Sequence, residues 1–297
     1  MTSLWHRAQL ICPLCQQSLV AAYPADSKSQ ISTMSCENRH SFDIGKSGYL
    51  HLIPVQNKRS KEPGDNKDMI AARKRFLSKG YYQPISSALN TIITQTMNKP
   101  SSDKMISPQQ FLDLGCGEGY YTARLKEQIN PEHFLLYGMD ISKAAIQQAA
   151  KRSKDIIWLV ANNKQIPMPD QSVDLIFSVF SPIIPKECHR ILKPQGLLIT
   201  ATTESKHLLS LRSLIYEEVR DYDNEKLEKQ LSSHFNHQAK EVIRHSLSLT
   251  QPEDVLDLLQ MTPHYWRTNT DKRKQLTALS SLETELVVQL QVFAPRS

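Results

Sequence analysis

The sequence has no apolar run long enough to cross a bilayer, which argues against a helical membrane protein. Its N-terminal segment, MTSLWHRAQLICPLC, lacks the long apolar region of a signal peptide. It also shows no internal repeat and no low-complexity tract, which argues against a repeat protein. The absence of a bilayer-spanning run and of a signal peptide predicts a cytoplasmic protein that has no membrane partner and keeps its thiols reduced.

What is present is the composition of an ordinary globular protein. Of the 297 residues, 40% are hydrophobic and 22% are charged. This length is enough for one α/β domain with a substantial core and a small appended module. The formal net charge is +6, and most of the excess lies in one stretch, since residues 56–80 hold eight Lys or Arg and three Asp or Glu. Such a basic segment, 56–79, is typical of a polyanion-binding surface or of a solvated loop and helix face.

The most informative stretch is FLDLGCGEGYY, residues 111–121. An apolar strand ends at Asp113, a turn follows with glycines at 115, 117 and 119, and a helix opens near Tyr120. Glycines permit positive φ angles and allow a ligand to approach the backbone. The helix directs unpaired N–H groups and the positive end of its dipole at the same place. The pattern predicts the first βα unit of a nucleotide-type site.

The glycine spacing decides which ligand is expected. A dinucleotide fingerprint requires glycine at the sixth position from Gly115, but that position is Tyr120. A phosphate-binding P-loop is excluded because no Gly-Lys-Ser/Thr follows. The run D-x-G-x-G-x-G instead resembles the first motif of class I S-adenosylmethionine (SAM) methyltransferases, so Gly115, Gly117 and Gly119 are expected to bind SAM. An NAD site and a purely structural turn remain the alternatives.

Beyond this turn the hydrophobic pattern alternates between strands and helices, with strands apolar throughout, as in a parallel sheet covered on both faces. Asp140 ends the second strand, where a carboxylate can accept hydrogen bonds from both ribose hydroxyls, although it could also cap the next helix. Asn162 follows the third strand and could contact an adenine edge or simply form a turn. The expected strands are 111–114, 134–139, 156–160, 173–180 and 197–201, with further strands in 241–250 and 284–293; the expected helices are 68–78, 85–97, 121–129, 143–151, 186–192 and 208–220.

A second constellation precedes the basic segment. Cys12 and Cys15 form a C-x2-C pair, and Cys36 and His40 follow after a gap of twenty residues. Two such pairs can complete a tetrahedron around one Zn²⁺. Four protein ligands leave no open position, which predicts a structural rather than a catalytic ion. The alternatives are a redox pair, which would need a βαβ setting, and free thiols in a small core.

Together these segments resemble one family, the bacterial 23S rRNA (guanine-N1-)-methyltransferase A family. The resemblance rests on the zinc ligands, then PVQNKRSKEPGD, FLSKGYYQP, DLGCGEGYYT and a late LLQMTP, in this order. It implies that SAM contacts include Tyr82, Gly119, Tyr120 and His207. Two departures from the family pattern are the longer gap between the zinc pairs and the absence of glycine and proline from residues 202–205.

The resemblance implies methylation of guanine N1 in a hairpin loop of 23S rRNA, with structural zinc and SAM as cofactors. The rRNA stem-loop would be held by segment 56–79 and the zinc module. The expected fold is an α/β, Rossmann-like, mostly parallel sheet with helices on both faces, plus an N-terminal zinc-ribbon-like module. The expected domains are the zinc module (1–54), the basic linker with its helices (55–109) and the methyltransferase domain (110–297).

Several points stay open at this level. The sequence does not identify the base that would remove the guanine N1 proton. Whether the chain forms a homodimer is likewise undetermined. The competing functions are a small-molecule SAM methyltransferase, which leaves zinc and basic segment unexplained, and a zinc-dependent RNA-binding protein without catalysis, which leaves the glycine turn and Asp140 unexplained.

Overall fold

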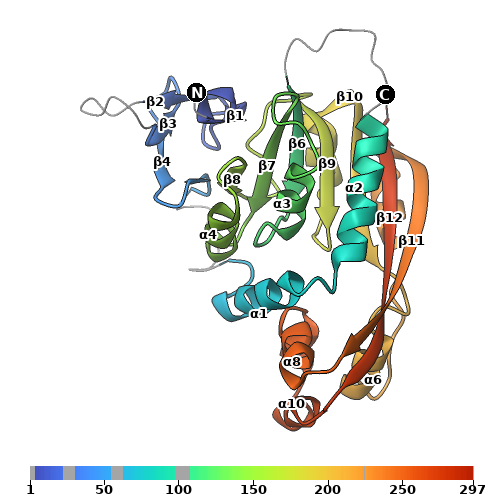
Figure 1. Ribbon diagram of the computed structural model, residues 1–297. Coiled ribbons are helices and arrows are strands. Elements are labelled where there is room, and N and C mark those ends of the chain that lie inside the picture. The colour runs from blue at the N-terminus through green and yellow to red at the C-terminus, as the bar shows by residue number, and fades with distance from the viewer. Residues whose placement is uncertain (1–3, 23–30, 55–62, 98–107, 224, 297) are drawn as a thin grey trace.

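A computed structural model describes residues 4–22, 31–54, 63–97, 108–223 and 225–296 (Figure 1). A twelve-stranded sheet runs through it in the order β1-β2-β3-β4-β5-β8-β7-β6-β9-β10-β12-β11. Within the described residues, no helix is both long and apolar enough to cross a bilayer.

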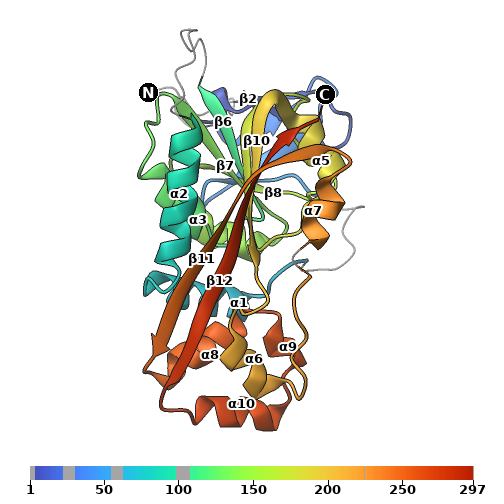
Figure 2. The same cartoon turned by 90° about the vertical axis from the view of Figure 1, so that its right-hand side faces the viewer.

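The centre of the sheet is parallel, as the apolar strand patterns predict. It consists of β5 (Tyr49–His51), β8 (Ile157–Val160), β7 (Phe134–Asp140), β6 (Gln109–Leu114), β9 (Val173–Val179) and β10 (Leu192–Thr203). Two long antiparallel strands complete one edge, namely β12 (Leu282–Pro295) and β11 (Phe235–Leu249). Both strands are longer than the sequence pattern predicts, and they extend well below the rest of the sheet (Figure 2).

Helices cover the two faces of the parallel sheet. Against one face, the core includes Ile85 and Leu89 of α2 and Ile146 of α4. On the other face, Ile191 of α5 and Leu231 of α7 are buried in a second core. The helices that cover the two faces are α2 (Gln83–Met97), α3 (Tyr120–Lys126), α4 (Lys143–Arg152), α5 (Pro185–Ile191) and α7 (Lys226–Leu231).

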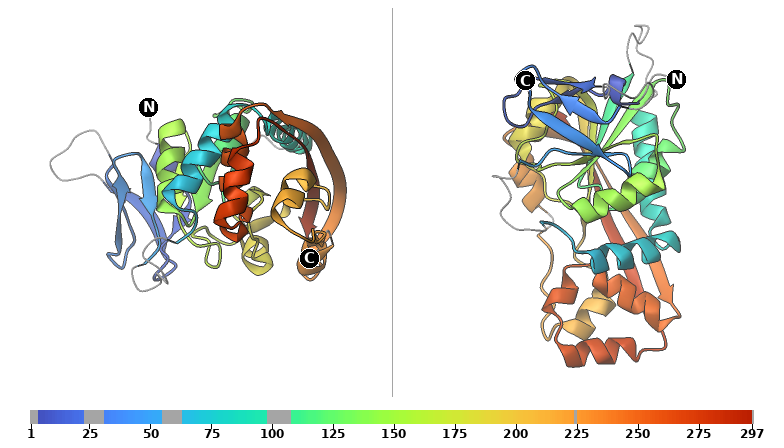
Figure 3. Two further views of the ribbon diagram at one scale, coloured as in Figure 1. Left: turned by 90° about the horizontal axis from the view of Figure 1, so that it is seen from below. Right: turned by 90° about the vertical axis from the view of Figure 1, so that its left-hand side faces the viewer.

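The N-terminal module continues the sheet instead of standing apart from it. It begins with the 3-10 helix η1 (Leu4–Arg7), and its strand β5 pairs in parallel with β8. Its last two strands form an antiparallel hairpin in which Ile44 pairs with Leu50. The module lies at the edge opposite β11 (Figure 3). Its other strands are β1 (Leu10–Ile11), β2 (Ser18–Ala22), β3 (Thr33–Ser35) and β4 (Ser41–Gly45).

A group of helices, here called the helical lobe, lies beneath the carboxyl ends of the parallel strands (Figures 1 and 2). It consists of α1 (Lys67–Ser78), α6 (Leu209–Ile215), α8 (Pro252–Gln260), α9 (His264–Arg267) and α10 (Thr270–Thr277). Helix α1 begins where Asn66 accepts a hydrogen bond from the Met69 N–H, and it packs against α8.

Helix α6 is shorter than expected. The sequence pattern predicts a helix over 208–220, but α6 ends at Ile215. Tyr216 is extended, with φ −103° and ψ 142°, and the buried guanidinium of Arg212 donates to the carbonyl of Arg220. This contact turns residues 216–220 back over the helix, so the expected last turns do not form.

Candidate functional site

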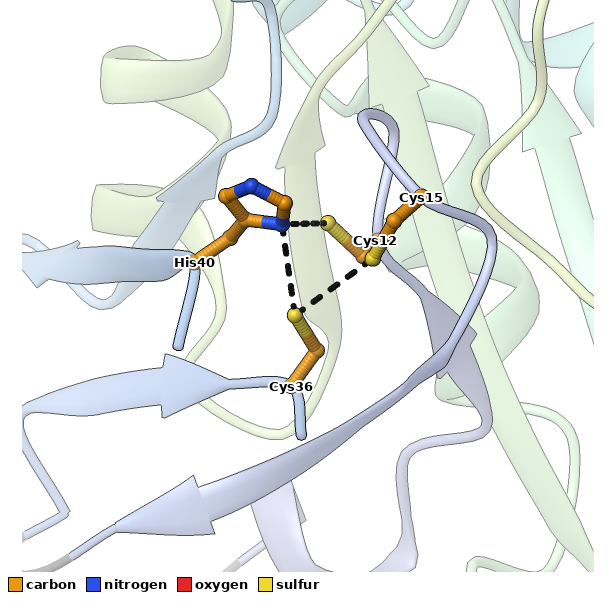
Figure 4. Close-up of side chains that lie close together, drawn as sticks. All are labelled: Cys12, Cys15, Cys36 and His40. Carbon is orange, nitrogen blue, oxygen red and sulfur yellow. Dashed lines mark hydrogen bonds between the residues drawn. The ribbon is translucent and has the colours of Figure 1, made fainter. Parts of the chain in front are cut away.

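Four side chains of the N-terminal module meet at one point (Figure 4). The Sγ atoms of Cys12 and Cys36 each lie 3.5 Å from Nδ1 of His40, and Sγ of Cys15 lies 3.6 Å from Sγ of Cys36. A tetrahedral zinc ion with bonds of about 2.3 Å to sulfur and about 2.05 Å to nitrogen requires S···N edges of about 3.5 Å and S···S edges of about 3.8 Å. The residues therefore fit one structural zinc ion.

Local backbone geometry brings these ligands together. Cys12 and Cys15 lie on a tight turn in which the Gln16 N–H donates to the Cys12 carbonyl, and Cys36 and His40 lie on a second turn. Gln16 and Arg39 have positive φ angles of 63° and 61°, which close these two turns. The zinc module also contacts the α/β domain directly, because the Gln9 N–H donates to the Tyr137 hydroxyl at 3.0 Å.

The glycine turn links β6 to α3. Its three glycines, 115, 117 and 119, all have positive φ angles, of 80°, 56° and 81°. A Cβ at Gly117 would clash with nothing, because the one atom within 4 Å of it is Arg73 Nη1, at an ordinary contact distance of 3.6 Å. A ligand can therefore lie against the backbone at Gly117.

The other two glycines are required for packing. A Cβ at Gly115 would lie 1.9 Å from the Ser181 hydroxyl, and one at Gly119 would lie 2.7 Å from the Trp158 ring and 2.9 Å from Ala149 Cβ. Gly119 thus allows the start of α3 to pack closely against β8 and α4. Gly119 faces these packed side chains and does not line the cavity described below.

We predict that Gly119→Ala destabilises the fold by about 3 kcal/mol, because it combines a left-handed backbone with overpacking. Gly48→Ala is the matched control, since Gly48 has a similar φ of 85° but nothing within 4 Å of its missing Cβ. The control should cost about 1 kcal/mol of backbone strain alone. Urea unfolding of both variants measures the difference, and equal losses would contradict the packing role of Gly119.

Asp140 at the end of β7 is tied to the glycine turn. Its Oδ2 accepts the Gly117 N–H at 3.0 Å, and its Oδ1 accepts the Ser142 N–H at 2.8 Å. Burial raises the pKa of Asp140, and the two N–H groups act against that rise. Each carboxylate oxygen keeps a further lone pair, so Asp140 can still accept hydrogen bonds from a ligand.

Asp113 has a different role. Burial raises its pKa to about 7, and its Oδ2 accepts the hydroxyl of Thr122 in α3 at 2.6 Å. This bond joins the end of β6 to the first turn of α3. Asp113 does not line the cavity described below, and it positions the glycine turn by holding the two elements that flank it.

A cavity of about 540 Å³ opens between the carboxyl ends of the parallel strands and the helical lobe. This volume is in the range of cofactor sites. Of the eight residues predicted to bind the cofactor, six line this cavity: Tyr82, Gly115, Gly117, Tyr120, Asp140 and His207.

Asn162 lies elsewhere. Its side-chain oxygen accepts the Lys164 N–H at 3.0 Å, and its carbonyl accepts the Gln165 N–H at 3.0 Å. It does not line the cavity and forms a turn after β8. Of the two roles that the sequence leaves open for Asn162, the geometry shows the turn.

Several cavity residues were not predicted as site residues. Phe180 follows β9, and Tyr222 and His264 come from the chain after α6 and from α9. Met261, Thr262 and Pro263 belong to the LLQMTP run on which the resemblance rests, and this run could have placed them at the site. The cavity is also lined by three residues that hold buried polar atoms without a partner in the described structure: Glu118 Oε1, Tyr120 Oη and Tyr121 Oη. Such atoms fit the charged methionine end of SAM.

Comparisons with known proteins agree with both halves of this arrangement. Residues 10–61 match the N-terminal domain of RlmA, and residues 111–196 match a methyltransferase domain. The 23S rRNA (guanine(748)-N(1))-methyltransferase of Streptomyces fradiae is 31% identical over 266 residues, covering 89% of this chain and 88% of that protein. The chain belongs to the RlmA family. YxjB of Bacillus subtilis is 30% identical over 285 residues, which cover 94% of each protein.

Other proteins resemble only part of this RlmA-family chain. The malonyl-[acyl-carrier protein] O-methyltransferase of Hahella chejuensis is 31% identical over 130 residues, or 39% of this chain. The solved structure of PH0226 from Pyrococcus horikoshii covers 72% of the chain at 18% identity and a TM-score of 0.49. The predicted fold class is confirmed, and the chain is a SAM-dependent methyltransferase whose cofactors are SAM and one zinc ion.

Proposed function

We propose that this RlmA-family enzyme methylates N1 of a guanine in a hairpin loop of 23S rRNA. The observation that carries the proposal is similarity to the Streptomyces fradiae enzyme over almost the whole chain, zinc module included. Similarity to the malonyl-[acyl-carrier protein] enzyme covers less than half of the chain. A small-molecule methyltransferase would leave the zinc module without a use.

We propose that Asp140 accepts the ribose hydroxyls of SAM while Gly117 lies against the cofactor. Bound SAM supplies an activated methyl group. Burial lowers the pKa of His207 to about 4, so its imidazole is neutral. Its Nδ1 accepts the Val287 N–H at 3.3 Å, which leaves the proton on Nε2 as a donor. Tyr82 and Tyr120 are proposed to enclose the cofactor, and Gly115 and Gly119 to shape its turn.

The basic segment contributes fewer free charges than its composition suggests. Arg73 pairs with Asp65 at 2.5 Å, Arg75 donates to Asp257 at 2.9 Å, and Lys79 pairs with Asp254. These contacts fasten α1 within the fold, especially to α8. Lys67 and Lys74 are exposed, and Lys58, Arg59 and Lys61 lie outside the described residues.

We propose that rRNA phosphates are held by Lys58, Arg59, Lys61, Lys67 and Lys74, with the zinc module recognising RNA shape. The proposed domains remain 1–54 for RNA recognition, 55–109 for the basic linker and helices, and 110–297 for methyl transfer.

Replacing Lys58, Arg59 and Lys61 with glutamine should weaken rRNA binding and reduce the slope of log affinity against log salt by about 2 to 3, because each lost phosphate contact lowers it by about 0.7 to 0.9. The control is Arg75→Gln with Lys79→Gln, which removes charges already paired with carboxylates. It should reduce stability and leave the salt slope close to that of the wild type. Fluorescence anisotropy with an rRNA hairpin measures both. Equal slopes in all three proteins would contradict the assignment.

Primer extension over 23S rRNA from a strain lacking the gene tests the function itself. Methylation of N1 blocks base pairing, so reverse transcriptase should stop at one loop guanine in the wild type. We expect that stop to vanish in the deletion strain and to return on complementation. An unchanged set of stops would overturn the proposal.

A further inference from the structure

Phe180 is an unusual residue at the mouth of the cofactor cavity. It directly follows β9, and its φ of 55° lies in the left-handed region, which costs energy for a bulky side chain. It is also 41% exposed. Its backbone N–H donates to the Ala201 carbonyl at 2.9 Å, which holds it in this conformation. Backbone strain at an exposed aromatic residue beside a cofactor cavity indicates that the ring of Phe180 has a functional role.

Two further rings flank Phe180. Its centroid lies 6.2 Å from that of Tyr82, nearly edge-on, and 6.0 Å from that of His207. These neighbours set the orientation of the phenyl ring while leaving part of it uncovered. A planar base taken out of an RNA helix could stack on such a ring.

A second cavity of about 400 Å³ adjoins the first, and Tyr222 and His264 line both. We call it the arginine pocket. Its charged lining residues are Arg212, Glu218, Arg220, Asp221 and Arg267. The two carboxylates belong to exposed residues, whereas Arg212 is only 3% exposed.

Arg212 carries a buried charge that no carboxylate pairs with in the described part of the chain. Its guanidinium donates to the carbonyls of Ser205 at 2.7 Å, His207 at 3.3 Å and Arg220. It also lies over the Tyr222 ring, 4.3 Å from the centroid. A buried cation solvated only by neutral groups is costly, so an anion in the pocket would be favoured.

The wall between the two cavities adds no charge of its own. His264 lies between the hydroxyls of Tyr216, at 2.8 Å from Nδ1, and Tyr222, at 3.2 Å from Nε2. Burial lowers the pKa of His264 to about 4, with Arg212 and Arg267 adding to the effect. A neutral imidazole has one N–H and one lone pair, so it can serve both hydroxyls and fix their positions.

We propose that Phe180 and the arginine pocket form the site for the extruded target nucleotide. Phe180 stacks on the base beside the cofactor, and Arg212 and Arg267 hold the adjoining backbone phosphate. This assignment rests on the proposed rRNA methylation and adds the place of the substrate to it. The shared wall of Tyr222 and His264 puts the phosphate next to the cavity in which the base is held.

Steady-state methylation of an unmodified 23S rRNA transcript, with SAM affinity measured by calorimetry, tests the assignment. Phe180→Leu should lower kcat/KM by about 10- to 100-fold through loss of stacking, and Phe180→Tyr should restore most of it. Arg267→Gln should raise KM for the transcript about 10-fold and reduce the salt slope of binding by about 1. All three variants should bind SAM within about twofold of the wild type.

Arg244→Gln is the matched control, because Arg244 is exposed on β11 and lies outside both cavities. It should behave as the wild type. If methylation persists and Phe180→Leu and Arg267→Gln match this control, the nucleotide site is wrong while the proposed function stands. If the wild type binds SAM but does not methylate the transcript, the proposed function fails and the nucleotide site fails with it.

Discussion

Cys36→Ser will abolish zinc binding and unfold the N-terminal module. Cys36 is buried, and its Sγ lies within 3.6 Å of two other ligand atoms. Zinc contributes about 10 to 16 kcal/mol in small zinc-finger peptides, far more than a core this small can supply. We expect zinc content to fall from one ion per chain to near zero. Residues 10–52 should become sensitive to protease.

Cys188→Ala is the control for this experiment. Cys188 is also fully buried, but it belongs to α5 and is not one of the four zinc ligands. It should keep one zinc ion and the wild-type protease pattern. A Cys36→Ser protein with a full zinc ion and a protected N-terminal module would show that the cluster is not the metal site.

The second large effect concerns the cofactor. Asp140→Ala should weaken SAM binding by at least about 100-fold, because it removes a half-buried carboxylate that can accept charge-assisted hydrogen bonds of about 1.5 to 3 kcal/mol each. It also leaves the Gly117 N–H without its acceptor, so the glycine turn loses its tie to β7. Calorimetric titration with SAM measures the loss.

Asp155→Ala serves as the matched control for Asp140. Asp155 lies between α4 and β8, it is exposed, and its only described ion pair is with Lys126. SAM affinity should be unchanged in this variant. If Asp140→Ala binds SAM as tightly as Asp155→Ala does, the cofactor does not depend on this carboxylate.

The local parts of the site could be read from the sequence because each depends on nearby residues. The glycine turn follows from three positive φ angles within five residues, and the zinc turns follow from two short ligand spacings. The strands of the parallel sheet are recognisable because they are apolar throughout. These signals do not depend on how distant segments pack.

The helical lobe and the arginine pocket could not be predicted in this way. Helix α1 joins α8 through ion pairs such as Arg75 with Asp257, which are 182 positions apart. No local spacing reveals that the charges of segment 56–79 are partly neutralised by these carboxylates. Likewise, Arg212 and His264 face one pocket only after the chain has folded.

Phe180 shows the same limit at a single residue. In the sequence it ends the expected strand 173–180, whose apolar pattern is that of a strand covered on both faces. Its exposure arises from the left-handed backbone and the bond to Ala201, neither of which an amino-acid pattern encodes.

The most direct test of the central claim is nucleoside analysis of 23S rRNA after incubation with the purified enzyme and SAM. Unmodified rRNA should gain about one 1-methylguanosine per molecule with the wild type and almost none with Asp140→Ala. The account would be contradicted if the wild type binds SAM and transfers its methyl group to a small molecule or to acyl-carrier protein while forming no 1-methylguanosine in 23S rRNA.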